Sequence, residues 1–261
     1  MISLASGILP EFGAVDVVHA ASCAGYDAVG LWVDPAEWTP ATTIAVNRRL
    51  ADANLRVLDV EVVWIKPGPL DPAHLTIIDI GLELGARNLL VVSSDPDEAA
   101  TQAKFAALCD HAGVSGLRVA LEFGMFTDVK TIQQAHRIVA GVGHGAAALL
   151  VDPIHLDRSG GTADDVAAIP PAYLPYAQLC DAAPCTFDTA DFDAVIRDAV
   201  DERRQLGQGC LPLPAIIAAL PAQTPYSIEL RSSALRNQFA DPVERAAAVL
   251  DATRSYLATI S

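Results

Sequence analysis

Residues 118–124, RVALEFG, show how this chain folds. Successive side chains of a strand point to opposite faces, so Val119, Leu121 and Phe123 share one apolar face while Glu122 lies on the other, near the carboxyl end. A short run of this kind is typical of a parallel strand covered by helices. A glutamate that faces the interior of such a sheet costs free energy unless it has a partner, so Glu122 is a candidate functional residue.

Seven further stretches share this strand pattern. With residues 118–123, the candidate strands span residues 2–8, 27–33, 56–64, 88–93, 147–152, 176–180 and 226–230. Helical periodicity lies between them, in residues 42–53, 72–84 and 96–112 and in a last helix capped by Asp241, with Pro242 first and Glu244 third. This alternation predicts an α/β fold, and the chain length divided by eight is about 33 residues, one unit of a (β/α)8 TIM barrel. We expect a single domain over residues 1–261, with one long loop at residues 181–209.

Composition and charge exclude several classes of protein. The chain is 52% hydrophobic and 19% charged, which excludes global disorder, and its net charge of −15 repels phosphate backbones and anionic membranes. The five cysteines form no Cys-x-x-Cys pair, the N-terminus has no cationic signal region, and the longest uncharged run, residues 205–228, contains four prolines. We expect a cytoplasmic protein with reduced cysteines that binds neither nucleic acid nor a membrane.

Polar residues lie at the ends of four consecutive strands in the second half of the chain. They are Glu122, Asp152, Gln178 and Glu229, with spacings of 30, 26 and 51 residues. The carboxyl ends of barrel strands meet at one mouth, so these side chains should converge, and carboxylates that converge in an apolar barrel repel one another unless a cation neutralises them. Carboxylate and amide oxygens suit Mg²⁺ or Mn²⁺. The sequence therefore predicts one divalent metal ion.

Structural roles would also explain these four residues. Asp152 could be a turn residue before Pro153, and Gln178 could be a buried amide of the core. Glu122 and Glu229 could form ion pairs with Arg118 and Arg231. The common strand register of all four favours a shared site instead.

Motifs along the whole chain carry a family resemblance. They are SLASGIL (residues 3–9), AGYDAVGLWV (24–33), LEFG (121–124), VDPIHLDRSGG (151–161), YAQLCDA (176–182), QLGQGCLPL (205–213) and SIELRSS (227–233). Their order and spacing resemble the xylose isomerase-like TIM barrel superfamily of sugar phosphate isomerases and epimerases. The resemblance implies that Glu122, Asp152, Gln178 and Glu229 bind one metal ion. It also implies that His155, three residues after Asp152, lies beside the metal or contacts the substrate.

The resemblance further implies a reaction. In related ketose epimerases, the glutamates that Glu122 and Glu229 match remove and return a proton on opposite faces of the carbon next to a carbonyl, through an enediolate. Sugar epimerases usually have His where Gln178 stands. The amide favours Mn²⁺ or Mg²⁺, with Zn²⁺ and Co²⁺ as alternatives, and resembles 3-dehydroshikimate dehydratases of the same fold. Endonucleases of the superfamily hold three zinc ions with further histidines, whereas five of the six histidines here fall in or beside predicted helices.

Four more residues are expected to bind the substrate. Arg231 shares the inward face with Glu229, and Arg158 follows the sixth strand, so each guanidinium can hold an anionic or hydroxyl group, although both also suit ion pairs. Glu61 and Trp32 lie near the ends of the third and second strands and should line the same mouth.

We expect an enzyme of carbohydrate metabolism, a metal-dependent isomerase or epimerase that acts on a small polyhydroxy carbonyl substrate such as a sugar or sugar phosphate. Its catalytic residues would be Glu122, Glu229 and His155. A dehydratase (lyase) of the 3-dehydroshikimate or inosose type shares the first step and is the alternative enzyme. A sugar-binding barrel without catalysis is the alternative outside enzymes, and the resemblance suggests a homodimer.

Overall fold

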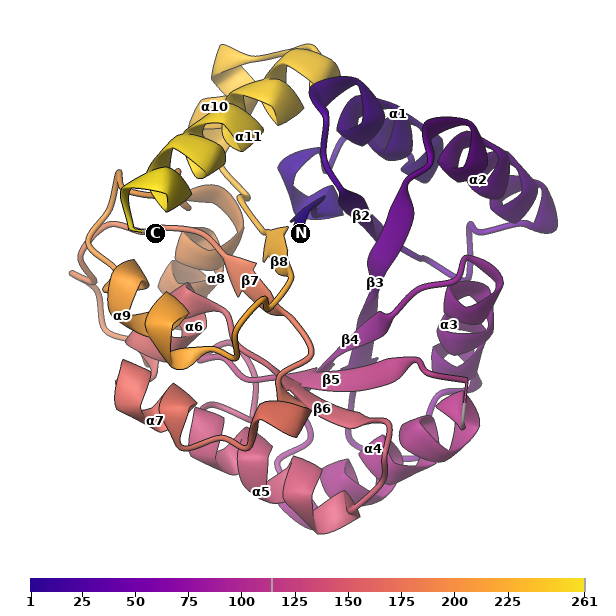
Figure 1. Cartoon of the computed structure of the whole chain (residues 1–261). Coiled ribbons are helices and arrows are strands. Elements are labelled where there is room, and N and C mark those ends of the chain that lie inside the picture. The colour runs from indigo at the N-terminus through magenta and orange to yellow at the C-terminus, as the bar shows by residue number, and fades with distance from the viewer. Residues whose placement is uncertain (114, 261) are drawn as a thin grey trace.

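Eight parallel strands form a barrel in the computed structural model, which describes residues 1–113 and 115–260 (Figure 1). The strands are β1 (Ile2–Leu4), β2 (Ala28–Trp32), β3 (Arg56–Ile65), β4 (Asn88–Ser93), β5 (Arg118–Glu122), β6 (Ala147–Leu150), β7 (Ala177–Leu179) and β8 (Tyr226–Ile228). Their ladder runs β6-β5-β4-β3-β2-β1-β8-β7. A parallel bridge between Val151 and Ala177 joins β6 to β7. The chain is thus a (β/α)8 TIM barrel, as predicted.

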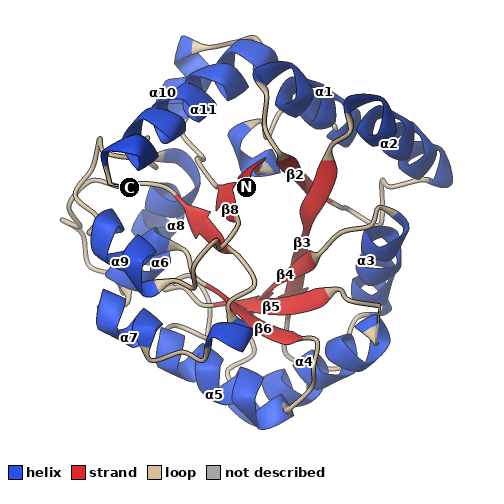
Figure 2. Ribbon diagram, viewed as in Figure 1, coloured by secondary structure: helices blue, strands red, loops and turns tan. Residues whose placement is uncertain are grey.

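Helices surround the barrel on its outside (Figure 2). They are α1 (Ala14–Ala24), α2 (Pro40–Ala53), α3 (Pro72–Glu83), α4 (Glu98–Ala112), α5 (Ile132–Val142), α6 (Pro153–Arg158), α7 (Ala163–Ala167), α8 (Phe192–Asp201), α9 (Leu213–Ala219), α10 (Ser233–Gln238) and α11 (Pro242–Thr259), with 3-10 turns η1 (Ser6–Ile8) and η2 (Pro171–Tyr173). The predicted cap of the last helix is confirmed, because Asp241 Oδ1 accepts the N–H groups of Val243 and Glu244. None of the described helices has both the length and the apolar character that crossing a bilayer requires.

The first strand ends earlier than predicted. The sequence predicts a strand to residue 8, but β1 ends at Leu4 and the chain turns into η1. The Ser6 hydroxyl takes over the role of a backbone partner here, because it donates to Gly30 O at 2.9 Å and accepts from Trp32 N–H at 3.1 Å. The turn brings Gly7 against the barrel mouth, where a Cβ would lie 2.4 Å from Glu229 Oε1.

The interior of the barrel changes character along its axis. Small and branched side chains fill part of it, in a cluster of Ala28, Leu58, Leu90, Val92, Ala120, Ala148, Leu150 and Tyr176. Val119, Leu121 and Phe123 belong to the larger core, as the alternation in β5 predicts. Gln178 pairs in register with Ser227, two residues before Glu229. The register therefore carries Glu122, Gln178 and Glu229 to one end of the barrel.

The segment after β7 folds across this end. It contains α8, as expected for a long loop with helix inside it, and two antiparallel bridges tie it down, Asp181 to Arg204 and Glu202 to Ser232. The buried carboxylate of Asp181 also accepts the N–H groups of Gly207, Gly209 and Leu211. All five cysteines are free thiols.

Candidate active site

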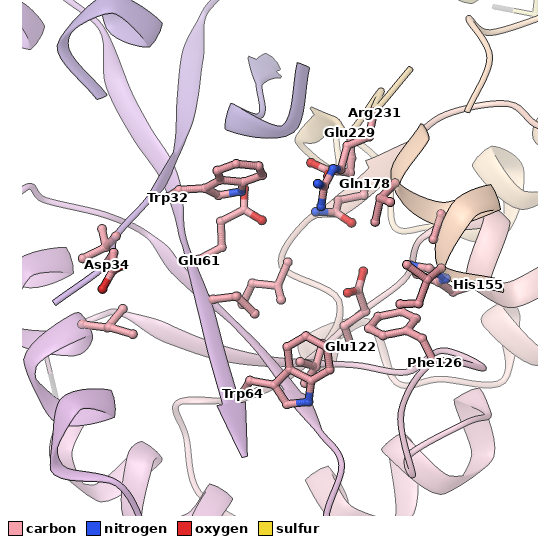
Figure 3. Close-up of a pocket in the computed structure, with 18 of the residues that line it drawn as sticks. Trp32, Asp34, Glu61, Trp64, Glu122, Phe126, His155, Gln178, Glu229 and Arg231 are labelled. Carbon is pink, nitrogen blue, oxygen red and sulfur yellow. The ribbon is translucent and has the colours of Figure 1, made fainter. Parts of the chain in front are cut away.

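A pocket of about 450 Å³ opens at the carboxyl ends of the strands (Figure 3). It is lined by seven of the nine residues predicted for the site, namely Trp32, Glu61, Glu122, His155, Gln178, Glu229 and Arg231. Asp152 is fully buried directly behind the pocket wall, and Arg158 lies elsewhere. The structure thus gathers the predicted residues from both halves of the barrel, with one exception.

Gln178 contacts two of the other predicted metal ligands. The end of the Gln178 amide lies 3.2 Å from Asp152 Oδ2 and 2.9 Å from Glu122 Oε1. If the amide NH₂ occupies this position, it donates to both carboxylates. If the amide oxygen occupies it, its distance from each carboxylate oxygen matches the spacing of neighbouring ligands around an octahedral ion, about 3 Å for metal–oxygen bonds of about 2.1 Å.

Arg203 is a buried cation of the site that the sequence did not single out. Its Nη1 donates to Asp152 Oδ2 at 2.5 Å and to Glu229 O at 3.0 Å, and its Nε donates to Ala199 O at 2.6 Å. The Arg203 guanidinium and the Asp152 carboxylate are both buried, so their charge-assisted hydrogen bond is shielded from water. Arg203 therefore links the end of α8 to β6 and β8.

His155 lies next to Asp152 and Arg203. Its Nε2 is 3.9 Å from Asp152 Oδ2 and 3.4 Å from Arg203 Nη2, and its ring packs on Phe126 with centroids 5.0 Å apart. Burial lowers the pKa of His155 to about 4. At neutral pH the imidazole is uncharged, so Nε2 can accept a hydrogen bond from the Arg203 guanidinium or bind a metal. Ligand atoms of Glu122, Asp152 and His155 all lie within 4.8 Å of one another.

Glu229 faces Glu122 across the pocket rather than joining this compact group (Figure 3). Burial raises the pKa of Glu229 even though Arg203 and Arg231 oppose the shift. Burial and then the charge of Asp152 raise the pKa of Glu122. For Asp152, burial acts in the same upward direction, but Arg203 outweighs it and the pKa is lowered. Burial thus shifts two carboxyl groups of the site toward the protonated form, while Arg203 shifts the third toward the charged form.

Two more buried carboxyl groups come from β3. Neither oxygen of Asp59 has a hydrogen-bond partner among the described residues, and neither does Glu61 Oε1. Burial, followed by the charge of Glu229, raises the pKa of Asp59 to about 7, and burial raises that of Glu61 in the same way. The barrel mouth therefore holds more carboxyl groups than Arg203 and Arg231 can neutralise.

This chemistry fits a divalent metal ion. The carboxyl groups of Glu122 and Asp152 and the amide of Gln178 supply oxygen donors at a suitable spacing, and the unpartnered Glu229 Oε2 is buried in the same mouth. Excess buried negative charge is relieved by a cation. His155 offers a nitrogen donor at the same place, so the donor set admits Zn²⁺ as well as Mg²⁺ and Mn²⁺.

Arg231 lies at the edge of this charged group. Its guanidinium stacks over the ring of Trp32, 5.2 Å from the ring centre, and its Nε is buried without a partner. No hydrogen bond or salt bridge joins its side chain to another described residue, although Glu229 and Glu61 attract it. It does not form the direct ion pair with Glu229 that the structural alternative requires. Arg231 can therefore receive a polar group of a ligand.

Arg158 does not reach the pocket, contrary to the expectation that it binds substrate. Its Nε donates to Asp198 Oδ2 at 2.9 Å, its Nη1 to Asp157 Oδ2 at 2.5 Å, and its Nη2 to Ala183 O at 2.7 Å. The side chain points away from the pocket because Asp198 of α8 and Ala183, after β7, accept hydrogen bonds from its guanidinium. Arg158 anchors the covering segment to α6. The structural alternative for Arg118 is also wrong, because its guanidinium donates to the carbonyls of residues 146, 147 and 172 and does not pair with Glu122.

Sequence reasoning missed three contributors to the site. Arg203 falls in the charged run DERRQ (residues 201–205), where nothing local distinguishes it from the exposed Arg204. Phe126 and Asp59 were also missed. The one available signal was the alternation of β3, VLDVE, which puts Asp59 on the same face as Glu61.

Comparison with known proteins supports the fold. The family described as the xylose isomerase-like TIM barrel matches residues 18–256. A comparison with curated proteins found no match. A solved structure, a fusion of a xylose isomerase-like TIM barrel with a 4-hydroxyphenylpyruvate dioxygenase, is 22% identical with a TM-score of 0.79. It covers 99% of this chain, which spans 44% of the fusion protein.

Other solved structures match over nearly their whole length. IolI with bound zinc is 16% identical with a TM-score of 0.82, covering 98% of each chain. A D-allulose 3-epimerase from Methylomonas sp. with D-allulose is 18% identical with a TM-score of 0.71, covering 98% of this chain and 96% of its own. A probable 3-DHS dehydratase from Bacillus anthracis is 14% identical with a TM-score of 0.71, covering 96% of this chain and 98% of its own. These likenesses show the fold alone.

The family match spans most of the sequence, and the barrel places the polar ends of β5 to β8 around one pocket. The chain therefore belongs to the xylose isomerase-like TIM barrel family.

Proposed function

We propose that the protein is a divalent-metal-dependent isomerase or epimerase that moves a proton on a carbon next to the carbonyl of a small hydroxy carbonyl compound, through an enediolate. The observation that carries this proposal is the contact of Gln178 with both Glu122 and Asp152, in a pocket that Glu229 also lines. The family includes enzymes of this kind, among them the D-allulose 3-epimerase. A bound ion would polarise the carbonyl and so acidify the neighbouring C–H bond.

Glu122 and Glu229 would carry the proton. They come from β5 and from the end of β8 and face each other across the pocket, so a substrate between them presents opposite faces to the two carboxyl groups (Figure 3). Their raised pKa values make both carboxylates stronger bases than exposed glutamates, which suits groups that take up and return a proton. His155, uncharged and fixed by Phe126 and Arg203, would donate or accept a hydrogen bond at the substrate oxygen. Arg231 would bind a further polar group.

A dehydratase is the second candidate, and Gln178 favours it. In this reaction the same carboxylate would remove the proton, and a hydroxyl on the next carbon would then leave as water after taking a proton from a carboxyl group of the pocket. The Glu, Asp, Gln, Glu set resembles that of 3-dehydroshikimate dehydratases, and a probable 3-DHS dehydratase shares the fold. The first proton transfer is common to both candidates, and the product separates them.

The test begins with the metal. Protein purified without chelator should contain bound metal or take up Mn²⁺, and a content below about 0.1 equivalent with no uptake would reject the site. The loaded protein is then mixed in D₂O with ketoses, inosose and 3-dehydroshikimate and followed by NMR. Deuterium beside the carbonyl, absent with Glu122→Gln, supports proton transfer. Binding without exchange would instead indicate a sugar-binding barrel.

A further inference from the structure

A second pocket, of about 570 Å³, lies between the loop after β3 and the helices α3 and α4. It shares Trp64, labelled in Figure 3, with the active-site pocket, but none of Glu122, Gln178 and Glu229 lines it. Three of the six residues 67–72 are prolines, whose rings fix the backbone of this loop. The pocket therefore offers a stiff apolar wall to a ligand, made of Trp64, Ile65, Pro67, Pro69, Leu70 and Pro72.

Positive charge gathers at this second pocket, although the protein is acidic. The chain has a net charge of −15 and only three lysines, and two of them, Lys66 and Lys104, line the pocket. The acidic residue of the lining, Asp71, is exposed and caps α3, where its Oδ1 accepts Ala73 N–H at 2.9 Å. Its charge is thus directed at the positive end of the helix. The pocket combines an apolar wall with two ammonium groups.

Lys66 has no counter-ion. Its Nζ lies over the ring of Trp64, 3.7 Å from the ring centre, and forms no hydrogen bond or ion pair with another described residue. Burial lowers the pKa of Lys66, and no carboxylate opposes the shift. A ring face attracts an ammonium group but leaves its N–H donors free for oxygen acceptors. In a chain with 32 acidic and 17 basic side chains, this unpaired ammonium group is available to an external anion.

Two further nitrogen atoms at the pocket have unused hydrogen-bonding capacity. Lys104 Nζ donates to Lys66 O at 2.5 Å and to Asp95 Oδ2 at 2.6 Å, which leaves the third of its N–H donors free among the described residues. His74 Nδ1 is buried and has no hydrogen-bond partner among the described residues. Burial lowers the pKa of His74, so at pH 7.5 its ring is neutral. A buried polar atom without a protein partner is typically bonded to water or to a ligand.

We propose that this pocket binds a small organic monocarboxylate with an apolar body. The carboxylate accepts hydrogen bonds from Lys66 and Lys104, and the body packs against Leu70 and the prolines of the loop. Because Asp95 already pairs with Lys104, one positive charge, that of Lys66, remains for the ligand, which suits a monoanion better than a phosphate dianion. This site is separate from the proposed reaction, and its ligand need not be the substrate.

The test is a ¹⁹F NMR titration of the full-length protein at pH 7.5 and constant ionic strength. The probes are 4-fluorobenzoate and 4-fluorobenzyl alcohol, which have the same apolar body but differ in charge. We expect the carboxylate to bind at least about tenfold more tightly than the alcohol. Acetate, which has the charge but almost no apolar body, should not displace 4-fluorobenzoate at equal concentration.

Variants of three cationic residues locate the bound carboxylate. Lys66→Met removes the charge and keeps most of the apolar stem, so it should weaken binding of 4-fluorobenzoate by about tenfold, whereas Lys66→Arg keeps the charge and should bind nearly as the native protein does. Lys130→Met removes the third lysine, which is exposed and does not line the pocket, and should leave binding unchanged. Arg231→Met removes a cation of the active-site pocket and should also leave binding unchanged. Thermal melts of the variants identify any folding defect.

The outcomes decide between this site and the active-site pocket. Saturable binding that only Lys66→Met weakens supports the proposal. Equal affinities of the native protein and Lys66→Met overturn it. Loss of binding in Arg231→Met also overturns it, because the carboxylate would then lie in the active-site pocket. So does equal binding of 4-fluorobenzoate and the neutral alcohol, because the ammonium groups would then select nothing.

Discussion

Replacing Arg203 tests whether the site is held together by charge. Arg203→Met keeps most of the side-chain volume but removes the guanidinium that bonds Asp152 Oδ2, Glu229 O and Ala199 O. Breaking a buried ion pair costs about 3–5 kcal/mol, because the remaining charge stays buried without a partner. In a chain of this length, 1 kcal/mol corresponds to about 2–4 °C in Tm, so the metal-free variant should melt roughly 6–20 °C lower.

The neighbouring Arg204 provides the control. Arg204→Met removes the same charge from an exposed position whose guanidinium bonds Gln208 O and no other atom of the described residues, and its Tm should change little. Circular dichroism melts of both variants, without metal at pH 7.5, give the comparison. If the unpaired Asp152 carboxylate is the cause, Asp152→Asn in the Arg203→Met background should cost less than it does alone. A drop for Arg203→Met no larger than that for Arg204→Met would refute the reasoning.

Three further predictions concern metal binding and the covering segment. Gly7→Ala should weaken Mn²⁺ binding by at least about tenfold, because its Cβ would displace Glu229. Calorimetric titration measures the Mn²⁺ affinity of this variant and of the control Gly13→Ala, whose Cβ would meet no atom within 4 Å. Equal affinities of the two variants would contradict the prediction. The gain in Tm on adding Mn²⁺ should grow from pH 5 to pH 8. Burial raises the pKa values of Glu122 and Glu229 in the folded protein, so without metal their stabilising protons are lost as the pH rises, and the ion replaces them; a gain independent of pH would count against these residues as ligands. Asp181→Asn should lower Tm by about 5 °C or more and speed proteolysis between β7 and β8, because an amide cannot accept N–H bonds at both positions; unchanged proteolysis would argue against Asp181 as the anchor of this segment.

The sequence predicts the barrel well because burial on both faces of parallel strands leaves a local pattern. All eight strands lie where apolar runs alternate with helical segments, and the inward parity of Glu122 and Gln178 follows from the period of two. The end of β1 was missed for a specific reason. The Ser6 hydroxyl replaces a backbone partner in the ladder, and no local pattern distinguishes such a serine from one inside a strand.

The site was only partly predictable, because its balance of charge depends on tertiary contacts. Arg158 and Arg203 both lie in segments that follow a strand with a polar end. Arg158 nevertheless anchors α6 to α8, whereas Arg203 enters the barrel and binds Asp152. The difference is set by which carboxylate each guanidinium can reach once α8 has folded across the mouth. A loop conformation of this kind is not encoded by periodicity, so arginines in loops are the weakest part of a site predicted from sequence.

The contacts of Arg203 and Gln178 allow the site to fold without a bound metal ion. Arg203 neutralises Asp152, and the Gln178 amide donates to both Asp152 and Glu122 when its NH₂ group points toward them. If a metal ion binds here, rotation of the same amide by half a turn would present its oxygen to the ion in place of the NH₂ group. The barrel already has a large core of its own. In small zinc domains, by contrast, the binding energy of the metal is the folding energy. If Gln178 is the third ligand, its neutral amide would let the site form without the ion, whereas a third carboxylate there would be repelled by Glu122 and Asp152.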